Sequence, residues 1–310
     1  MSAFHVYHTY ADLDYLRDYM AGSTYSSDWT ADTDVLLRIT EQASRIIDDH
    51  VGAGTFGPTT ETRLYDLGDG ALRYDPRQRL RTVGISTTEY RASVVPLDRW
   101  LITATTVIAY ADTARTTSET LVAGIANDYI LEPYNDIPKY RIKLSEETSK
   151  SFGAGQQVLS ILGSWGWENR SHSNGALDGA VTTSTSTSIV LTLIGTIAAG
   201  TTILVDSEQM YVTAVSANNR TLTVIRGVNG TTAATHLTAV VVYHIEYPED
   251  VSAACAEIAR TLYRGRDAGV IETIGTGEQR SMNRPRREIQ DVLMRLNHYA
   301  QHQPAAGLVF

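Results

Sequence analysis

Apolar residues recur at helical spacing in three stretches of the chain. Over residues 32–51 they fall at i, i+3 and i+4, which predicts an amphipathic helix with Asp32 or Asp34 as its N-cap. A second helix is predicted to begin at Pro248, because proline suits the first turn and two acidic residues follow it. A third is predicted over residues 285–300. The sequence therefore predicts one amphipathic helix in the N-terminal part of the chain and two in the C-terminal part.

Between the first two helices the pattern changes to strands. Residues Thr62–Tyr74 contain two short strand-like runs around a polar turn at Asp66–Gly70, which is typical of a hairpin. Further strands are predicted where apolar and polar positions alternate, in LRTVGISTTEYR, LITATTVIAYAD, DYILEPY, YRIKLS and QVLSILGSWGW.

Charged residues become rare between residues 170 and 246, where threonine and valine dominate. The β-branched runs SIVLTLIG, TTILVDSEQMYVTAVS, RTLTVIRGV and LTAVVVYHIEY are separated by turn residues. This segment predicts a small all-β module without a helix.

The predicted fold class is α+β. A helical bundle with antiparallel β elements forms a discontinuous body, and a small all-β domain is inserted into it. The predicted divisions are an N-terminal arm over 1–30, the body over 31–169 and 247–302, the inserted module over 170–246, and an extended tail over 303–310.

Composition narrows the possible partners. The 310 residues carry a net charge of −9, which argues against a sequence-independent grip on DNA or on an anionic membrane. No apolar run reaches the roughly eighteen residues of a membrane span, and the N-terminus lacks the layout of a signal peptide. The single cysteine, Cys255, excludes an intramolecular disulfide and lies on an apolar helix face, so we interpret it as a buried structural thiol in a protein assembled in a reducing cytosol.

The glycine-rich string GAGTFG at Gly52–Gly57 matches a dinucleotide-binding pattern only as letters. That mechanism needs a strand before the glycines and a helix after them. Here a helix precedes the string, and Pro58 with a predicted strand follows it. The string is therefore interpreted as a helix stop.

No constellation of residues predicts catalysis or a resident metal or cofactor. Asp206 and Glu208 lie two apart on a predicted strand and are interpreted as acidic residues on its solvated face rather than as a glycosidase pair. The histidines come without a third ligand at metal spacing and are interpreted as surface residues. They are His5, His8, His236 and His244. The sequence therefore predicts a protein that is not an enzyme.

Two features near the C-terminus leave two interpretations open. A cluster of four arginines leads into the last predicted helix, and three of them crowd its first turn, where positive charge opposes the helix dipole. They form either a solvated turn or a contact with an acidic partner or DNA phosphate, and they are Arg280, Arg284, Arg286 and Arg287. The terminal apolar residues are either a disordered tail or a docking peptide, and they are Leu308, Val309 and Phe310.

A family resemblance emerges when the Thr-rich module is set aside. FGAGQQVLSILGSWGWEN followed by YPEDVSAACAEIARTLYRGR resembles the C-terminal portion of head-to-tail connector proteins of tailed bacteriophages. The resemblance covers roughly residues 30–168 and 247–300, and it assigns Trp165, Trp167 and Pro248 to one structural junction. The segment ILVDSEQMYVTAVSANNRTLTVIRGVNGTTAATH resembles a β-module of phage tail and virion proteins.

The resemblance implies a structural role in the virion. Connector proteins of this type form a ring, commonly of twelve copies, under the portal protein, where the ring extends the channel for genomic DNA and provides a platform for tail or neck proteins. This chain would then assemble in the host cytoplasm, reside in the virion neck, and use neither cofactor nor membrane. From the basic cluster and the apolar terminus we further predict a portal or partner interface of Arg284, Arg286, Arg287, Leu308, Val309 and Phe310, with the tail from Gln303 to Phe310 inserted between portal subunits. The alternative is a phage tail or surface binding protein whose β-module recognises a carbohydrate or host surface.

Overall fold

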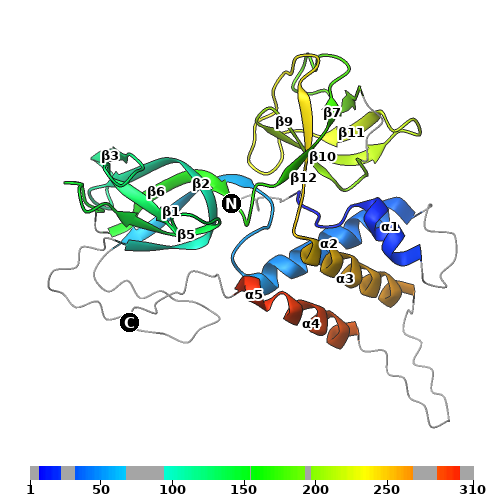
Figure 1. The fold of residues 1–310 in the computed structure, drawn as a ribbon, viewed down its shortest axis with the longest axis horizontal. Helices are drawn as coiled ribbons and strands as arrows, with labels where there is room; N and C mark the ends of the chain where they lie inside the picture. The colour runs from blue at the N-terminus through cyan, green and yellow to red at the C-terminus, as the bar shows by residue number, and fades with distance from the viewer. Residues whose placement is uncertain are drawn as a thin grey trace, which may run out of the picture. The chain divides into compact units, whose positions relative to one another are not determined.

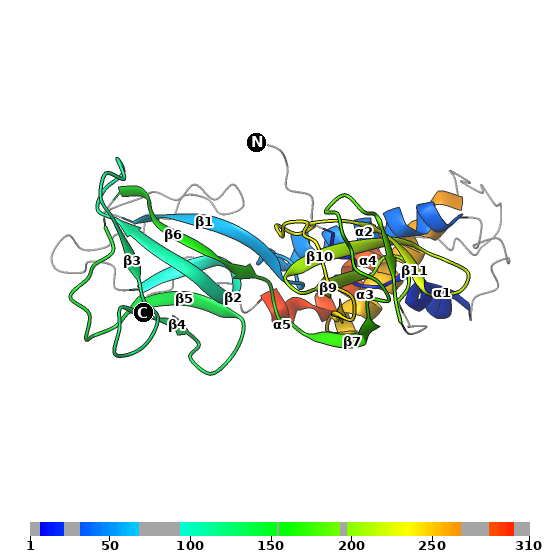
Figure 2. The same cartoon turned by 90° about the horizontal axis from the view of Figure 1, so that it is seen from above.

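The computed structural model describes most of the chain, over residues 7–21, 32–67, 94–153, 155–192, 197–267 and 285–300. Its contacts form two compact units, which Figures 1 and 2 show from two directions. Residues 1–52 and 169–301 form the first, here called the helix–barrel unit, and residues 53–168 form the main part of the second, here called the sheet unit.

The prediction of a helical bundle body is wrong. The structure is mostly β, with two antiparallel sheets of six strands and few helices. The physical reason is that the strands of the sheet unit bury their own apolar residues against one another. Leu97, Ile142 and Ile161 are completely buried within one core of that unit, so its strands form a β domain rather than an accessory to helices.

The sheet unit contains one antiparallel sheet in the order β1-β6-β2-β5-β4, with β3 paired to β2. The long strand β2 pairs with β6 along one edge, while β5 and β3 pair with its two ends on the other (Figure 1). The strands are β1 (Thr59–Leu67), β2 (Val94–Tyr110), β3 (Ser118–Leu121), β4 (Tyr129–Glu132), β5 (Lys139–Leu144) and β6 (Gly155–Trp165).

The helix–barrel unit contains the predicted helices. Helices α2 and α3 pack against each other although both β regions separate them in sequence, and α4 packs on α3 (Figure 1). Helix α2 ends at Gly52, whose left-handed φ of 74° forms the C-cap, so GAGTFG follows a helix as predicted. The helices are α1 (Leu13–Ala21), α2 (Thr33–Val51), α3 (Glu249–Asp267), α4 (Pro285–Arg295) and α5 (Asn297–Ala300).

Every regular element described between residues 170 and 246 is a strand. The order β7-β12-β9-β10-β11-β8 closes on itself, because Asp178 N donates to Val190 O at 2.8 Å and Thr192 N donates to Ala176 O at 2.8 Å. These bonds join the two outer strands into a barrel without a long open edge. The strands are β7 (Ser171–Ala176), β8 (Ser188–Val190), β9 (Thr202–Val205), β10 (Glu208–Val215), β11 (Thr221–Ile225) and β12 (Val241–Ile245).

An extended arm, residues 7–12, connects this barrel to α2. The Tyr7 amide donates to Asn229 Oδ1 at 2.7 Å and Thr202 Oγ1 donates to Tyr7 O at 2.5 Å, both on the barrel side. On the helix side, the Tyr10 amide donates to Ser44 Oγ at 3.1 Å. The arm is therefore an integral part of the helix–barrel unit, and residues 1–30 include helix α1 as well as the arm.

The units divide the chain at positions other than the expected domain boundaries. The expected body over 31–169 and 247–302 spans both units, whereas the module over 170–246 lies in the helix–barrel unit. These units describe contacts within the chain, and the domain division expected from the sequence, including the tail over 303–310, stays a prediction. None of the described helices is long and apolar enough to cross a membrane.

Candidate functional site

The main polar cluster of the barrel forms at the hairpin between β9 and β10. The prediction that Asp206 and Glu208 share the solvated face of a strand is wrong. Strand β9 ends at Val205 and β10 begins at Glu208, so a turn separates the two acidic residues and Asp206 adopts a φ of 52°. Asp206 is exposed, but Glu208 is fully buried.

The Glu208 carboxylate accepts hydrogen bonds from both side chains and backbone. Arg226 donates to it twice, from Nε and Nη2, each at 2.7 Å. The amides of Gly227 and Ala234 donate at 3.0 and 2.9 Å. Burial alone would raise the pKa of Glu208, but these hydrogen bonds and the Arg226 charge hold it below its usual value. The carboxylate is therefore ionised and satisfied at neutral pH.

His236 completes this cluster, and its interpretation as a surface histidine is wrong. It is buried, with Nδ1 at 2.8 Å from Asp206 Oδ2 and Nε2 at 2.8 Å from Glu208 Oε2. An imidazole between two carboxylates is a familiar acid–base arrangement, but a catalytic group must reach a substrate. Here the ring is enclosed and every neighbouring group already has a protein partner, so the cluster fixes the segment between Arg226 and His236 against the β9–β10 hairpin.

A signal in the sequence could have located Glu208. Along β10, Glu208 shares a face with Met210 and Val212, which are both buried in the barrel core. A single carboxylate on an apolar strand face in a charge-poor segment indicates a buried ion pair rather than a solvated residue. The distinctive string RGVNGTTAATH, residues 226–236, contains its partners Arg226 and His236.

The other predicted histidines also differ from surface residues. His8 is fully buried in the arm, with Nδ1 at 2.9 Å from the Tyr247 hydroxyl. His244 lies beside His172, with ring centroids 5.7 Å apart, and its partial burial lowers its pKa. His5 lies outside the described residues. Within the described part of the chain, no group of three histidine, cysteine or acidic residues is arranged to hold a metal ion.

Cys255 lies in the interface between α3 and α2, as predicted for a structural thiol. It is completely buried, with Sγ 3.4 Å from Ser44 Oγ. Burial raises the pKa of this thiol to about 11, so the reactive thiolate is suppressed at neutral pH.

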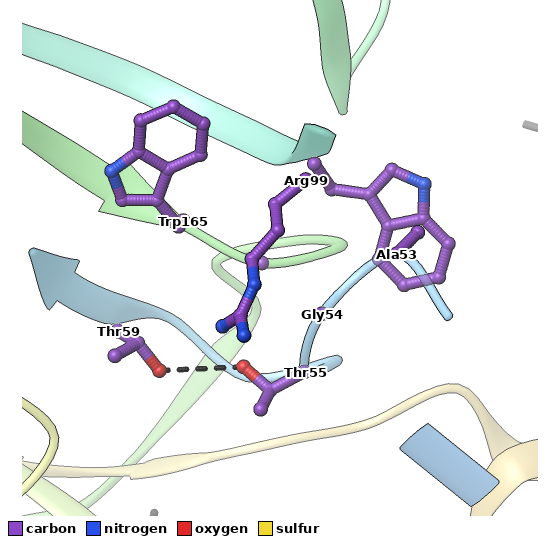
Figure 3. A pocket seen from close by; sticks show the side chains of 8 residues that line it. Ala53, Gly54, Thr55, Thr59, Arg99 and Trp165 are labelled. Carbon is purple, nitrogen blue, oxygen red and sulfur yellow. Dashed lines mark hydrogen bonds between the residues drawn. The ribbon is translucent and has the colours of Figure 1, made fainter. Parts of the chain in front are cut away.

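A small recess in the sheet unit lies between Trp165 and the GAGTFG segment. Figure 3 shows Arg99 extending across it toward Thr55 and Thr59, whose hydroxyls lie 3.3 Å apart. Glu61, at 3.6 Å, forms an ion pair with Arg99. The recess is too narrow for a water-sized guest, so it is a packed seam rather than a ligand pocket.

The two tryptophans of GSWGW lie in the sheet unit. Trp165 is buried and donates from Nε1 to Glu61 O at 3.0 Å. Trp167 packs edge-on against Trp100, with their ring centroids 4.8 Å apart. Pro248 belongs to the helix–barrel unit. The predicted junction of Trp165 and Trp167 with Pro248 therefore stays a prediction.

Most of the predicted partner interface lies outside the described residues. Arg284 and the terminal Leu308, Val309 and Phe310 belong to this undescribed part, as does Arg280 of the basic cluster. Two residues of the interface fall on α4, Arg286 and the exposed Arg287.

The candidate sites in the described residues are the ion-pair cluster around Glu208, the buried thiol of Cys255 and the packed recess beside Trp165. Each of them stabilises the fold. Comparison with models of protein families, with curated proteins and with solved structures found no match to this chain.

Proposed function

We propose that this chain is a structural head-to-tail adaptor of a tailed bacteriophage, which forms a ring under the portal protein. In this role the ring extends the DNA channel and provides the platform for tail attachment. The proposal extends the resemblance of the split GSWGW and PEDV segments to connector proteins. It does not require a helical bundle, because an adaptor functions through its surfaces.

One observation carries the proposal: the β-barrel has the geometry of an insertion. Its first and last strands pair with each other, with Ser171 opposite Ile245, and the Glu246 amide donates to Arg170 O at 3.0 Å. The chain therefore enters and leaves the barrel at adjacent points. A domain with adjacent ends can be inserted between two consecutive elements without separating them. This supports treating the flanking segments as one interrupted connector-like sequence.

The charge of the chain is compatible with this role. An acidic subunit repeated around a ring gives a negative channel, which limits adhesion of a passing phosphate backbone. Ring closure needs a heterologous interface between two different faces of each copy. A protein whose described charged clusters serve its own fold fits an assembly role.

The test is whether the full-length protein forms a ring or joins one. Purified protein is imaged by negative-stain electron microscopy, alone and with portal rings from the same phage, and co-sedimentation measures the bound fraction. We expect closed rings or portal-bound rings. A protein that stays monomeric and does not sediment with portal rings contradicts the proposal, and glycan-array binding by such a monomer would favour the alternative of a carbohydrate-binding tail protein.

A further inference from the structure

The loop between β3 and β4 in the sheet unit places apolar side chains in solvent. Val122 is 54% exposed and Ile125 is 60% exposed, and Ala123 and Ala126 beside them are also exposed. We call these four residues the apolar knob. Single exposed apolar residues are common on proteins, but a group of four in one short loop marks a candidate contact surface.

The backbone that carries the knob is held by its own hydrogen bonds. The Gly124 amide donates to Tyr129 O at 2.8 Å, and the Asp128 amide donates to Val122 O at 2.9 Å. Asn127 adds a bond from Nδ2 to Ala123 O at 2.9 Å. The loop thus presents its side chains in one fixed arrangement without needing a partner to order it.

The buried carboxylate of Asp128 holds the β3–β4 loop in place through hydrogen bonds. One carboxylate oxygen accepts from the Val122 amide at 2.7 Å and from Lys150 Nζ at 3.0 Å, and the other accepts from Thr148 Oγ1 at 2.9 Å. Burial by itself would raise the pKa of Asp128, but these donors lower it. The anchor is therefore ionised and fully bonded at neutral pH.

Carboxylates border the knob. The neighbouring segment is joined to it because Ser145 Oγ donates to Ile125 O, and that segment continues with the exposed residues Glu146 and Glu147. Lys143 lies 3.7 Å from Glu146, which is 89% exposed and therefore only weakly paired.

On the side of β3, Glu119 pairs with Lys150 at 3.4 Å, and Lys150 also neutralises Asp128. The bordering acidic residues outnumber the basic ones. The apolar surface therefore has a net negative rim.

We infer that the apolar knob docks into an apolar pocket of a protein partner whose rim carries lysine or arginine. A rigid loop binds with little loss of conformational entropy, which favours a preformed protein pocket. The acidic rim complements a basic one, whereas it is repelled by an anionic membrane. This inference deepens the proposed function, on which it rests in taking the portal ring as the partner.

The test compares two pairs of substitutions at opposite ends of β4. Val122→Ser with Ile125→Ser removes the apolar knob. Tyr134→Ser with Ile137→Ser removes two side chains of similar exposure, 62% and 51%, from the β4–β5 loop. Burying the exposed halves of two aliphatic side chains corresponds to about 30-fold in affinity, so the knob variant should bind portal rings about 30-fold more weakly and the control variant within about 3-fold of wild type.

A second variant tests the rim independently of the apolar side chains. Glu146→Lys with Glu147→Lys should slow association with portal rings and reduce its dependence on salt, because rim charges mainly steer the encounter. Thermal unfolding of all variants checks that these surface changes leave the fold intact.

The outcomes separate this inference from the proposed function. Wild-type protein that does not bind portal rings contradicts the proposed function and with it the partner named here. Wild-type binding that survives both the knob and the rim substitutions overturns the inference alone. Equal losses in the knob and control variants also overturn it, because the contact would then not be specific to the knob.

Discussion

Replacing Glu208 by glutamine removes the charge at the centre of the barrel's polar cluster. The variant keeps the shape of the side chain but leaves Arg226 buried without its counter-ion. Breaking a buried ion pair from one side costs about 3–5 kcal/mol. Arg226 keeps hydrogen bonds to backbone carbonyls, at 3.0 Å to Ser186 O and 3.3 Å to Thr183 O, so the lower end, about 3 kcal/mol, is expected.

Native-state hydrogen exchange measures this loss where it occurs. Peptides covering residues 203–212 and 222–236 report the barrel, and those covering α2 report the helices of the same unit. A loss of about 3 kcal/mol corresponds to slightly more than a hundredfold faster exchange in the barrel peptides.

The matched control is Asp178→Asn, which removes an exposed ion pair with Arg220 at 2.6 Å in the same barrel. Exposed pairs contribute about 0–1 kcal/mol, so the control should exchange within about fivefold of wild type. If Glu208→Gln changed the barrel no more than Asp178→Asn, the description of this cluster as the main polar anchor of the barrel would be refuted.

Three further predictions concern pH, the thiol and a glycine. Folding lowers the pKa values of Glu208 and Asp128, so their contribution to stability is complete above their ordinary pKa values of 4.5 and 3.8 and is lost as pH falls through the folded values. The urea concentration at the unfolding midpoint should therefore fall between pH 5 and pH 3. A midpoint that stays constant over this range would contradict the prediction. Cys255 should react with a thiol reagent only after denaturant is added, and rapid labelling of native protein would show that it is not buried. Gly163→Ala places a Cβ 2.4 Å from Thr103 O and should destabilise the sheet unit by about 1–3 kcal/mol. Tryptophan fluorescence during urea unfolding measures this loss, and an unchanged unfolding midpoint would contradict the close approach of the two strands.

Periodicity predicted α2, α3 and α4 because each has a clear apolar stripe and clear ends, whereas α1 lies in the segment expected to be an arm. Residues such as Val251, Ala254 and Ile258 occupy the buried face of α3 as the spacing predicts. The strands β3 and β7 were not predicted, because SETL and SHSNGA are short and mostly polar, and only their pairing with β2 and β12 makes them strands.

The fold class was wrong because a strand pattern does not show what the strand packs against. The same alternation fits a strand covering helices and a strand in an independent β core, and contacts such as Tyr65 with its sheet neighbours appear only in three dimensions. The buried cluster was missed for a related reason. Glu208, Arg226 and His236 are brought together by the closure of the barrel, which no local spacing reveals.

The most direct test of the proposed role is the oligomeric state of the full-length protein in the presence of portal rings. Negative-stain imaging with co-sedimentation should show a ring of this protein stacked coaxially on the portal. Monomers in solution and portal rings that sediment without bound protein would contradict the proposal that this chain is a head-to-tail adaptor.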